Sequence, residues 1–501
     1  VATGNTGTIG SLSMSAGTVN GAGTLVLNGL NWTGGLMSGT GSTSLSGSGV
    51  FSMTSGSGYG ASGAPSISRS FTVGSDATLT IYRSSTASYY YVYINNTTGN
   101  VGNLINNGTI NIDHQAANGI NYYLQFTYNN ATGTITNSGT IYVDLTGSST
   151  STNSYVYGNV TFNNTSGTVK TAATSTSNAN SVWMQYGSGA ISGTSYGDQG
   201  WWLESGTHTI SGTVSLRSGA TSGTPSLVVA GGTLTANSTA TVASLGFTSG
   251  IVNGTGTLTL NGLNWTGGVM RGTGSTVMSG SGTYALTTGV GTNETAPTIE
   301  RTVTVGSDVT LTIYRHGTSG YNYIYINSYT GNVGNLNNEG LINIRHATSS
   351  TLDQSLNLWY GNTAGGTITN SGIIDVSLTN GTGSYVYNPY VNLNNAGGTI
   401  RTASASDTVM TSVWSQQANA TFSGAGYGDR GLRISAGTST FTGSVGLRSG
   451  ATANTASMVL DGSGAVITVA TGNTGTIGSL SMSAGTVNGA GTLVLNGLNW
   501  T

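Results

Sequence analysis

The sequence predicts an all-β protein, a β-solenoid in which short strands stack as successive coils along a tandem array. Three observations lead to this prediction. Glycine accounts for 82 of the 501 residues, while only 5% of the residues are charged. The segment 1–33 returns unchanged at 469–501. Throughout the chain, short runs of alternating apolar and polar residues are separated by turns rich in Asn and Gly. Such self-similarity is typical of repeat architectures.

The composition excludes several classes of protein. Lys and Arg number 12 against 14 Asp and Glu, a net charge of −2, whereas a nucleic-acid-binding surface needs clustered basic residues. The residues that favour helices most, Ala, Leu, Glu and Lys, are scarce. No run of 18 apolar residues is present, so we expect no membrane insertion. Cysteine is absent, so no disulfide can stabilise the fold.

The identical segments fix a period of 468 residues, because residue 1 corresponds to residue 469. About half of that period is a looser repeat, marked by Trp32, Trp265 and Trp500 at spacings of 233 and 235 residues. The chain therefore divides into the end of a preceding repeat (1–18), a first copy (19–251), a second copy (252–486) and the start of a further repeat (487–501). No capping helix or charged cap is recognisable, so we expect a window cut from a longer, continuous array.

The smallest repeated unit is a coil of three short strands. In the strand predicted at 109–112, Ile110 and Ile112 point to one face while Thr109 and Asn111 point to the other. One coil cannot bury its apolar face alone, but stacked coils enclose a continuous core. Stacked coils lie ~4.8 Å apart. A charge repeated in register would therefore repel its own copy, whereas Thr, Ser and Asn can form hydrogen-bonded ladders.

These motifs resemble a known family of repeats. The pattern in INNGTINI (105–112) and ITNSGTIYV (135–143) is similar to the β-helix repeats of filamentous haemagglutinin and of autotransporters. The LNWTGG segments at 30–35 and 263–268 are similar to repeats of giant bacterial surface proteins of the adhesin type. The resemblance implies a right-handed, three-faced parallel β-helix, secretion, and a role as stalk, fibre or adhesin. It carries over no functional residue.

The ionisable residues do not form a catalytic pattern. The histidines His114 and His346 occupy matching positions but lack a second metal ligand at fixed spacing. Asp76 and Asp308 share a VGSD turn and could form structural pairs with Arg83 and Arg315; turn capping is the favoured interpretation and catalysis is the alternative. The sequence therefore predicts no catalytic residue, no metal site and no cofactor, and we expect the protein not to be an enzyme.

Aromatic residues are the only candidates for a functional surface. Tyr91 and Tyr93 lie on one face of a predicted strand, and Tyr323 and Tyr325 repeat them. An aromatic ladder along the fibre is the favoured interpretation, and a strip that binds sugars or a partner is the alternative. Trp201 and Trp202 have no tryptophan counterpart in the second copy, where the sequence reads Gly431-Leu432 at the position we align with them, and are candidates for contacts between fibres.

The sequence thus predicts a structural segment of a giant secreted β-solenoid protein that forms an extracellular filament, sheath or matrix fibre at the cell surface. Its expected partner is itself, through continuation of the coils, end-to-end contact or lateral bundling. The alternative is the stalk of a bacterial adhesin that binds glycans or host surfaces. Ice binding is less favoured because coil lengths of 28 and 31 residues would disturb a regular array of hydroxyls. A polysaccharide lyase lacks its carboxylate cluster.

Overall fold

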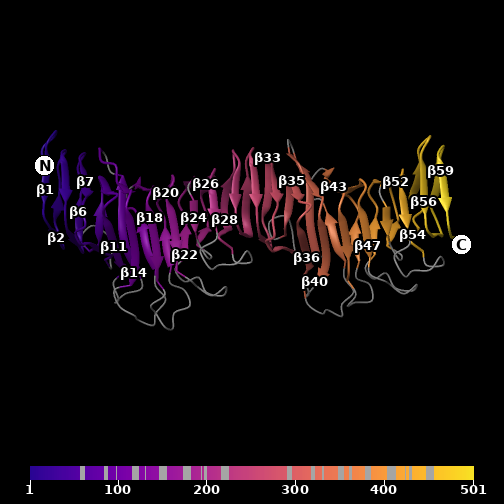
Figure 1. Cartoon of the computed structure of the whole chain (residues 1–501), viewed down its shortest axis with the longest axis horizontal. Helices are drawn as coiled ribbons and strands as arrows, with labels where there is room; N and C mark the ends of the chain where they lie inside the picture. The colour runs from indigo at the N-terminus through magenta and orange to yellow at the C-terminus, as the bar shows by residue number, and fades with distance from the viewer. Residues whose placement is uncertain are drawn as a thin grey trace. The chain divides into compact units, whose positions relative to one another are not determined.

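The computed structural model describes residues 1–56, 63–83, 89–96, 99–114, 123–129, 131–145, 155–172, 182–192, 194–196, 200–215, 225–289, 296–316, 322–329, 332–347, 355–359, 364–378, 385–402, 413–423, 425–427, 431–446 and 456–501 (Figure 1). The described residues contain strands and turns but no helix. They form two compact units, Val1–Gly246 (unit 1) and Phe247–Thr501 (unit 2). Long parallel sheets dominate both units, which confirms the all-β, solenoid-like repeat architecture.

In unit 1, strands that lie three apart along the chain are neighbours, so the strands fall into three columns, A, B and C. Column A contains β1 (Thr6–Ile9), β4 (Thr24–Leu27), β7 (Ser42–Leu45), β10 (Ser70–Val73), β13 (Asn103–Asn106), β17 (Thr134–Asn137), β20 (Thr161–Asn164), β23 (Gly189–Ile191) and β26 (Thr207–Ile210). Column B contains β2 (Leu12–Met14), β5 (Leu30–Trp32), β8 (Phe51–Thr54), β11 (Thr78–Arg83), β14 (Thr109–His114), β18 (Thr140–Asp144), β21 (Thr168–Thr171), β24 (Thr194–Tyr196), β27 (Thr213–Ser215) and β29 (Ala240–Val242). Column C contains β3 (Thr18–Val19), β6 (Gly35–Met37), β9 (Pro65–Ile67), β12 (Tyr89–Asn96), β15 (Tyr123–Thr127), β19 (Tyr155–Gly158), β22 (Val182–Gln185), β25 (Trp201–Leu203) and the first half of β28 (Leu227–Thr235). The second half of β28 pairs with β26 and continues column A. The short strand β16 (Ala131–Thr132) pairs antiparallel with β12.

Unit 2 has three columns of the same kind, lettered within that unit. Column A contains β31 (Thr257–Leu260), the second halves of β33 (Val269–Met278) and β35 (Thr298–Val305), β39 (Asn335–Asn338), β43 (Thr367–Asn370), β46 (Asn392–Asn395), β49 (Ala420–Phe422), β52 (Thr438–Phe441), β55 (Val466–Val469) and β58 (Thr486–Gly489). Column B contains β32 (Leu263–Trp265), β34 (Tyr284–Thr287), β36 (Thr310–Arg315), β40 (Leu341–His346), β44 (Ile373–Val376), β47 (Thr399–Thr402), β50 (Ala425–Tyr427), β53 (Ser444–Gly446), β56 (Thr474–Ile477) and β59 (Thr492–Leu495). Column C contains β30 (Leu245–Asn253), the first halves of β33 and β35, β37 (Asn322–Tyr329), β41 (Leu356–Trp359), β45 (Val386–Asn388), β48 (Trp414–Gln416), β51 (Leu432–Ile434), β54 (Met458–Leu460), β57 (Leu480–Met482) and β60 (Leu498–Trp500). The short strands β38 (Asn332–Val333) and β42 (Ala364–Gly365) pair antiparallel with β37.

Alternation along each strand builds the core, as the sequence predicts. Ile110 and Ile112 in β14 are each 1% exposed, whereas the alternating residues Thr109 and Asn111 are half-buried on the outer side. Coil length varies widely: register partners are 18 residues apart at Thr6 and Thr24, but 31 apart at Thr109 and Thr140. The strands nevertheless stay in register, because the extra residues fall between strands. Irregular coil length therefore does not disturb the strand columns, although it would disturb a regular array of hydroxyls on the outer side.

The repeat in unit 2 does not close on a whole number of coils. Its LNW strand occurs twice, as β32 at the start of column B and as β60 at the end of column C. Nine steps along column B from β32 lead to β59, and the LNW sequence follows one strand later. Likewise, TLTL forms β31 in column A and its counterpart TLVL forms β59 in column B. One repeat thus spans nine coils and one further strand, which moves each strand type to the next column.

Candidate functional site

The four predicted tyrosines lie on β12 and β37 and are largely buried. Tyr91 is 8% exposed and Tyr93 is 1% exposed, and both pack with Ala64. Their rings stack with centroids 5.6 Å apart, and those of Tyr323 and Tyr325 do the same at 5.6 Å. Each of these pairs runs along one strand rather than from coil to coil. Tyr323 also contacts Trp359 of the next coil, edge to face, at 5.9 Å.

Matching backbone contacts lie beside these tyrosines in the two units. The backbone of Tyr91 forms an antiparallel bridge with Gly56, and that of Tyr323 forms the same bridge with Gly289. Tyr325 is 5% exposed. In this structure Tyr91, Tyr93 and Tyr325 are therefore interior side chains, and a role for the four tyrosines in contacts between fibres stays a prediction.

Trp201 and Trp202 lie in β25 and differ in environment. Trp201 is 4% exposed, pairs in register with Trp183, and meets the ring of Phe162 edge to face at 5.7 Å. Trp202 is half-buried, and its indole nitrogen has no hydrogen-bond partner among the described residues. The register corrects the alignment of the two copies. Trp414, the counterpart of Trp183, pairs with Leu432, so Trp201 and Trp202 correspond to Leu432 and Arg433 rather than to Gly431 and Leu432.

An aromatic ladder does run from coil to coil, but through residues that the sequence analysis missed. The rings of Tyr123 in β15 and Tyr155 in β19 lie 4.3 Å apart, and those of Tyr157 and Tyr186 lie 4.1 Å apart. Burial raises the pKa of Tyr186 to about 12 and also raises the pKa of Tyr155. Tyr157 and Tyr186 are stacked, so each covers one face of the other ring, whereas Tyr123 and Tyr155 are tilted by 39°. In unit 2, Tyr387 instead donates a hydrogen bond to Gln417 at 3.0 Å.

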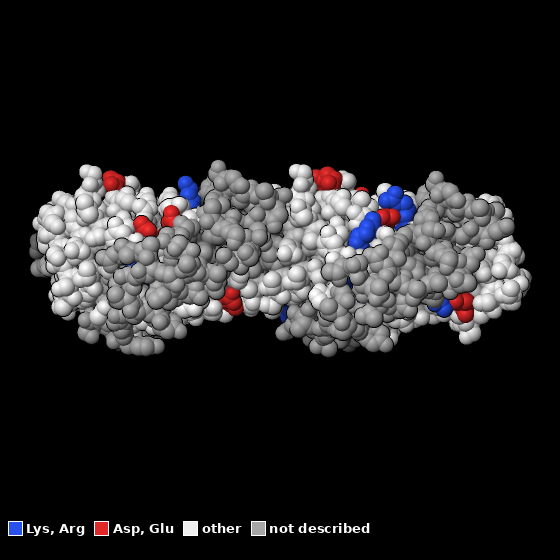
Figure 2. Space-filling view, turned by 90° about the horizontal axis from the view of Figure 1, so that it is seen from below, with Lys and Arg blue, Asp and Glu red and all other residues white. Residues whose placement is uncertain are grey.

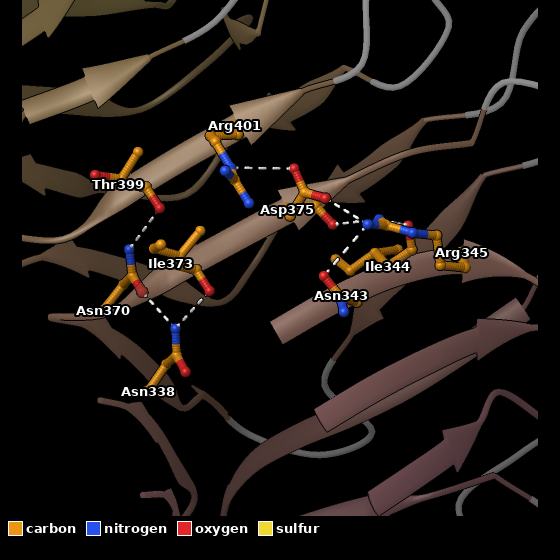
Figure 3. A network of polar contacts seen from close by, with 9 residues as sticks. All are labelled: Asn338, Asn343, Ile344, Arg345, Asn370, Ile373, Asp375, Thr399 and Arg401. Atoms are coloured by element: carbon orange, nitrogen blue, oxygen red, sulfur yellow. Dashed lines mark hydrogen bonds and ion pairs between the residues drawn. The ribbon is translucent and has the colours of Figure 1, made fainter. Parts of the chain in front are cut away.

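Each unit contains a buried asparagine ladder at the ends of its column A strands. The side-chain amide of Asn106 donates to Asn137 at 2.7 Å, and that of Asn137 donates to Asn164 at 2.6 Å. Asn164 ends the ladder by donating to the carbonyl of Gly167 at 2.7 Å. Unit 2 repeats this arrangement with Asn338, Asn370, Asn395 and Gly398, and Figure 3 shows the step from Asn338 to Asn370. All six ladder asparagines are at most 1% exposed, so the ladder is part of the core.

A buried arginine ties neighbouring coils together in each unit. Arg69 is 2% exposed and donates to the carbonyls of Gly23 at 2.9 Å, Ser42 at 2.7 Å and Ser38 at 3.2 Å. Arg301 makes the matching contacts in unit 2, with Gly256 at 2.9 Å and Ser275 at 2.7 Å. Burial lowers the pKa of Arg301 to about 10. These side chains hold the backbone and carry no feature of a binding site.

The acidic and histidine side chains have structural roles. The carboxylate of Asp76 accepts a hydrogen bond from the Gly47 amide at 2.7 Å, and Asp308 accepts one from Gly280 at 2.8 Å, so each aspartate bonds to a backbone amide of a neighbouring coil. His114 contacts the carbonyl of Leu145 at 2.9 Å, and burial lowers its pKa. Within the described residues, no group of three or more His, Asp or Glu side chains is placed to hold a metal ion. Those residues also contain no helix that is long and apolar enough to cross a membrane.

The outer sides of β14, β18 and β21 and of β40, β44 and β47 carry different charges. In unit 1, Asp113 and Asp144 are register partners on adjacent strands, and Lys170 lies on the third; we call these residues the acidic strip. In unit 2, Asp375 pairs with Arg345 and, at 3.3 Å, with Arg401; we call these residues the basic strip (Figure 3). Figure 2 shows how few charged side chains appear among the uncharged atoms of one face of the molecule.

Many of these residues link one coil to the next. The predicted aromatic residues pack mostly into the core, and the longest polar networks among the described residues link one coil to the next. Comparisons of this chain with family models, with curated proteins and with solved structures found no match in any of the three.

Proposed function

We propose that this chain is a structural segment of a secreted tandem-repeat protein, a right-handed, three-faced β-solenoid that forms an extracellular filament, sheath or matrix fibre. The observation that carries the proposal is the unchanged return of residues 1–33 at 469–501, in a chain whose strands stack coil on coil. Such a repeat can lengthen without limit, because each added coil contacts only its neighbours.

The buried asparagine ladders support a role in which the coils of a fibre resist separation. The side chains of Asn106 and Asn137 each donate a hydrogen bond to the ladder asparagine of the next coil, in addition to the parallel backbone pairing. The buried arginine spans further still, since Arg69 reaches carbonyls 27 and 46 residues away in the chain. Pulling coils apart would leave buried polar groups without partners, which is costly.

The stalk of an adhesin is the alternative function. A glycan-binding strip would need aromatic rings with free faces. In unit 1, the rings of Tyr157 and Tyr186 stack on each other, and those of Tyr123 and Tyr155 lie against each other at a tilt, so each ring is partly covered by its neighbour. The structural role is therefore better supported. Binding of this segment to members of a glycan panel would favour the adhesin.

Electron microscopy of the native protein tests the proposal. We expect thin, unbranched filaments, and discrete compact particles would contradict it. Denaturing electrophoresis of the same material then separates two kinds of fibre. A species far above 50.3 kDa would indicate that the repeats are covalently joined, and a species near that mass would indicate end-to-end association.

A further inference from the structure

A small cavity lies in the core of unit 1, lined by residues of columns A and C. Most of its lining is apolar, but Gln185 of β22, Trp201 of β25 and His208 of β26 also line it. Its volume of about 10 Å³ is close to the roughly 10–15 Å³ that one water molecule needs. The cavity therefore has room for a single water molecule and for no larger ligand.

Trp201 brings to this cavity a hydrogen-bond donor that lacks an acceptor. The side chain is 4% exposed, and its indole Nε1 has no hydrogen-bond partner among the described residues. Other buried tryptophans form this bond: Trp183 donates to Gln185 at 2.7 Å, and Trp32 donates to a backbone carbonyl at 3.0 Å. A buried N–H group without a partner is costly, so an acceptor placed in the cavity would be stabilised there.

His208 brings an acceptor to the same cavity. The ring is 2% exposed, and burial lowers its pKa, so the ring is neutral near neutral pH. Its Nε2 lies 2.8 Å from the carbonyl oxygen of Ser205. Because a carbonyl oxygen can only accept, Nε2 carries the hydrogen and Nδ1 keeps a lone pair. No described residue donates a hydrogen bond to this Nδ1.

A comparison with unit 2 shows that Gln185 can accept one more hydrogen bond. Both hydrogens of its side-chain amide donate to backbone carbonyls, so only its Oε1 is available, and this atom accepts from Trp183. In unit 2, the Oε1 of Gln416 accepts two hydrogen bonds, one of them from Asn388 at 2.8 Å. Unit 1 has Gly158 at the position of Asn388, so the second lone pair of Gln185 is not used by that residue.

We propose that one ordered water molecule occupies this cavity, accepts a hydrogen bond from Trp201 Nε1, and donates to His208 Nδ1 and Gln185 Oε1. One donor and two acceptors match the bonding capacity of water. A chloride ion could not bind the two acceptors, and an ammonium ion or a metal ion could not accept from the indole. Buried water molecules typically make about three hydrogen bonds. The inference does not depend on the proposed fibre function.

This water would link neighbouring coils beyond the end of the asparagine ladder. In unit 1 the ladder ends at Asn164 in β20, whereas the three partners of the water lie in β22, β25 and β26. The water joins column C to column A across the core. Unit 2 has Leu432 at the position of Trp201 and Ser439 at the position of His208. Since Leu432 has no donor, we expect the water in unit 1 only.

A high-resolution crystal structure of the full chain tests the proposal. We expect a peak of electron density within about 3.2 Å of Trp201 Nε1, His208 Nδ1 and Gln185 Oε1. Trp201→Phe removes the donor and should abolish the peak. Trp202→Phe is the matched control, because it removes the neighbouring indole, whose Nε1 also lacks a described partner, and it should leave the peak unchanged. An empty cavity in the native protein, or a peak that persists in Trp201→Phe, would overturn the proposal.

Nitrogen NMR of the histidine-labelled chain gives a second readout in solution, where only four histidines contribute. We expect His208 to carry its hydrogen on Nε2 and to show a hydrogen-bonded Nδ1. In Trp201→Phe the Nδ1 resonance should move downfield, toward that of a free lone pair, while Trp202→Phe should not shift it. A hydrogen on Nδ1, or a native Nδ1 resonance already typical of a free lone pair, would contradict the proposal. Neither readout depends on whether the chain forms filaments.

Discussion

The core beside β25 of unit 1 and beside β51 of unit 2 contains different side chains. In unit 1, Trp201 packs with Phe162 and with Trp183, next to His208, which is 2% exposed. In unit 2, Leu432 takes the place of Trp201.

In unit 2, two positions of column A carry larger side chains than in unit 1. Phe422 and Phe441 stack there with ring centroids 4.8 Å apart, at positions held by Ile191 and Ile210 in unit 1. The indole hydrogen bond is common to both units: Trp183 donates to Gln185 at 2.7 Å and Trp414 donates to Gln416 at 2.9 Å. Coil stacking therefore depends on the shared polar ladders and on total core volume, while the identity of each apolar residue is free to vary. Four predictions challenge this view.

The largest effect is expected at the asparagine ladder, which both units share. Replacing Asn137 by Ala removes two buried side-chain hydrogen bonds, the one that it accepts from Asn106 and the one that it donates to Asn164, which should cost about 3–5 kcal/mol of local stability. Asn370→Ala should cost the same in unit 2. Hydrogen exchange, read by mass spectrometry on peptides of each unit, measures both. The outward-facing Asn163→Ala serves as control and should change little. Unequal losses in the two units would refute a common ladder.

The next largest effect is expected for Trp201→Leu, which introduces the residue found in unit 2 without the two phenylalanines that accompany it there. The cavity left behind should lower the local unfolding free energy by about 2–3 kcal/mol. Adding Ile191→Phe and Ile210→Phe, which completes the unit 2 filling, should restore at least half of the loss. Guanidinium denaturation combined with hydrogen exchange over residues 182–210 provides the measurement. If the triple variant is no better than Trp201→Leu, volume does not compensate between columns.

A smaller effect is expected for the ion pair that lies beside the buried arginine of unit 2 and has no counterpart in unit 1. Next to Arg301, Arg271 pairs with Glu300 at 3.5 Å, whereas unit 1 has Ser38 and Ser68 at these positions. Glu300 is 5% exposed and also accepts a hydrogen bond from Asn327 at 3.3 Å. Glu300→Ser should cost about 1–2 kcal/mol. The double variant R271S/E300S should cost less than the sum of the single substitutions. Additive losses would show that the pair does not act as a unit.

The smallest effect concerns pH and distinguishes His208 from Ser439 of unit 2. Burial lowers the pKa of His208, so the folded state favours the neutral ring. The stabilisation is complete above the unfolded pKa of about 6.5 and is lost as the pH falls below it. Hydrogen exchange between pH 7.5 and 5 should therefore show unit 1 loosening around 207–210 before unit 2 does around 438–441. His208→Ser should abolish that difference, and an unchanged profile would exclude His208 as its source.

Much of this fold could be predicted from sequence, because strand alternation is a local property. The inward residues of β14 are those that the alternation assigns. Alternation predicts the face of the strand to which each side chain points, but it does not predict which residues cover that face. Tyr91 and Val92 therefore lie on opposite sides of β12 and are both buried. The asparagine ladder was accessible in principle, since Asn106 has the same parity as the inward Leu104, but its NNG context is typical of a turn. Arg69 likewise shares the parity of Ile67 and Phe71.

Burial itself cannot be derived from a segment alone. Trp32, for example, is 0% exposed. Trp32 pairs in register with Met53 of the next coil, and its indole donates to the carbonyl of Gly34 at 3.0 Å. A solenoid residue thus owes its environment to the neighbouring coil, which is information outside the segment itself.

The extra strand in each repeat has a mechanical consequence. A repeat of nine coils and one further strand passes every strand type from one column to the next. Any column that carries longer strands or bulkier side chains would bend a stack toward its opposite side. When three successive repeats each shift by one column, every column acquires the same content, and these bends cancel. An array of such repeats would therefore have no preferred direction of bending.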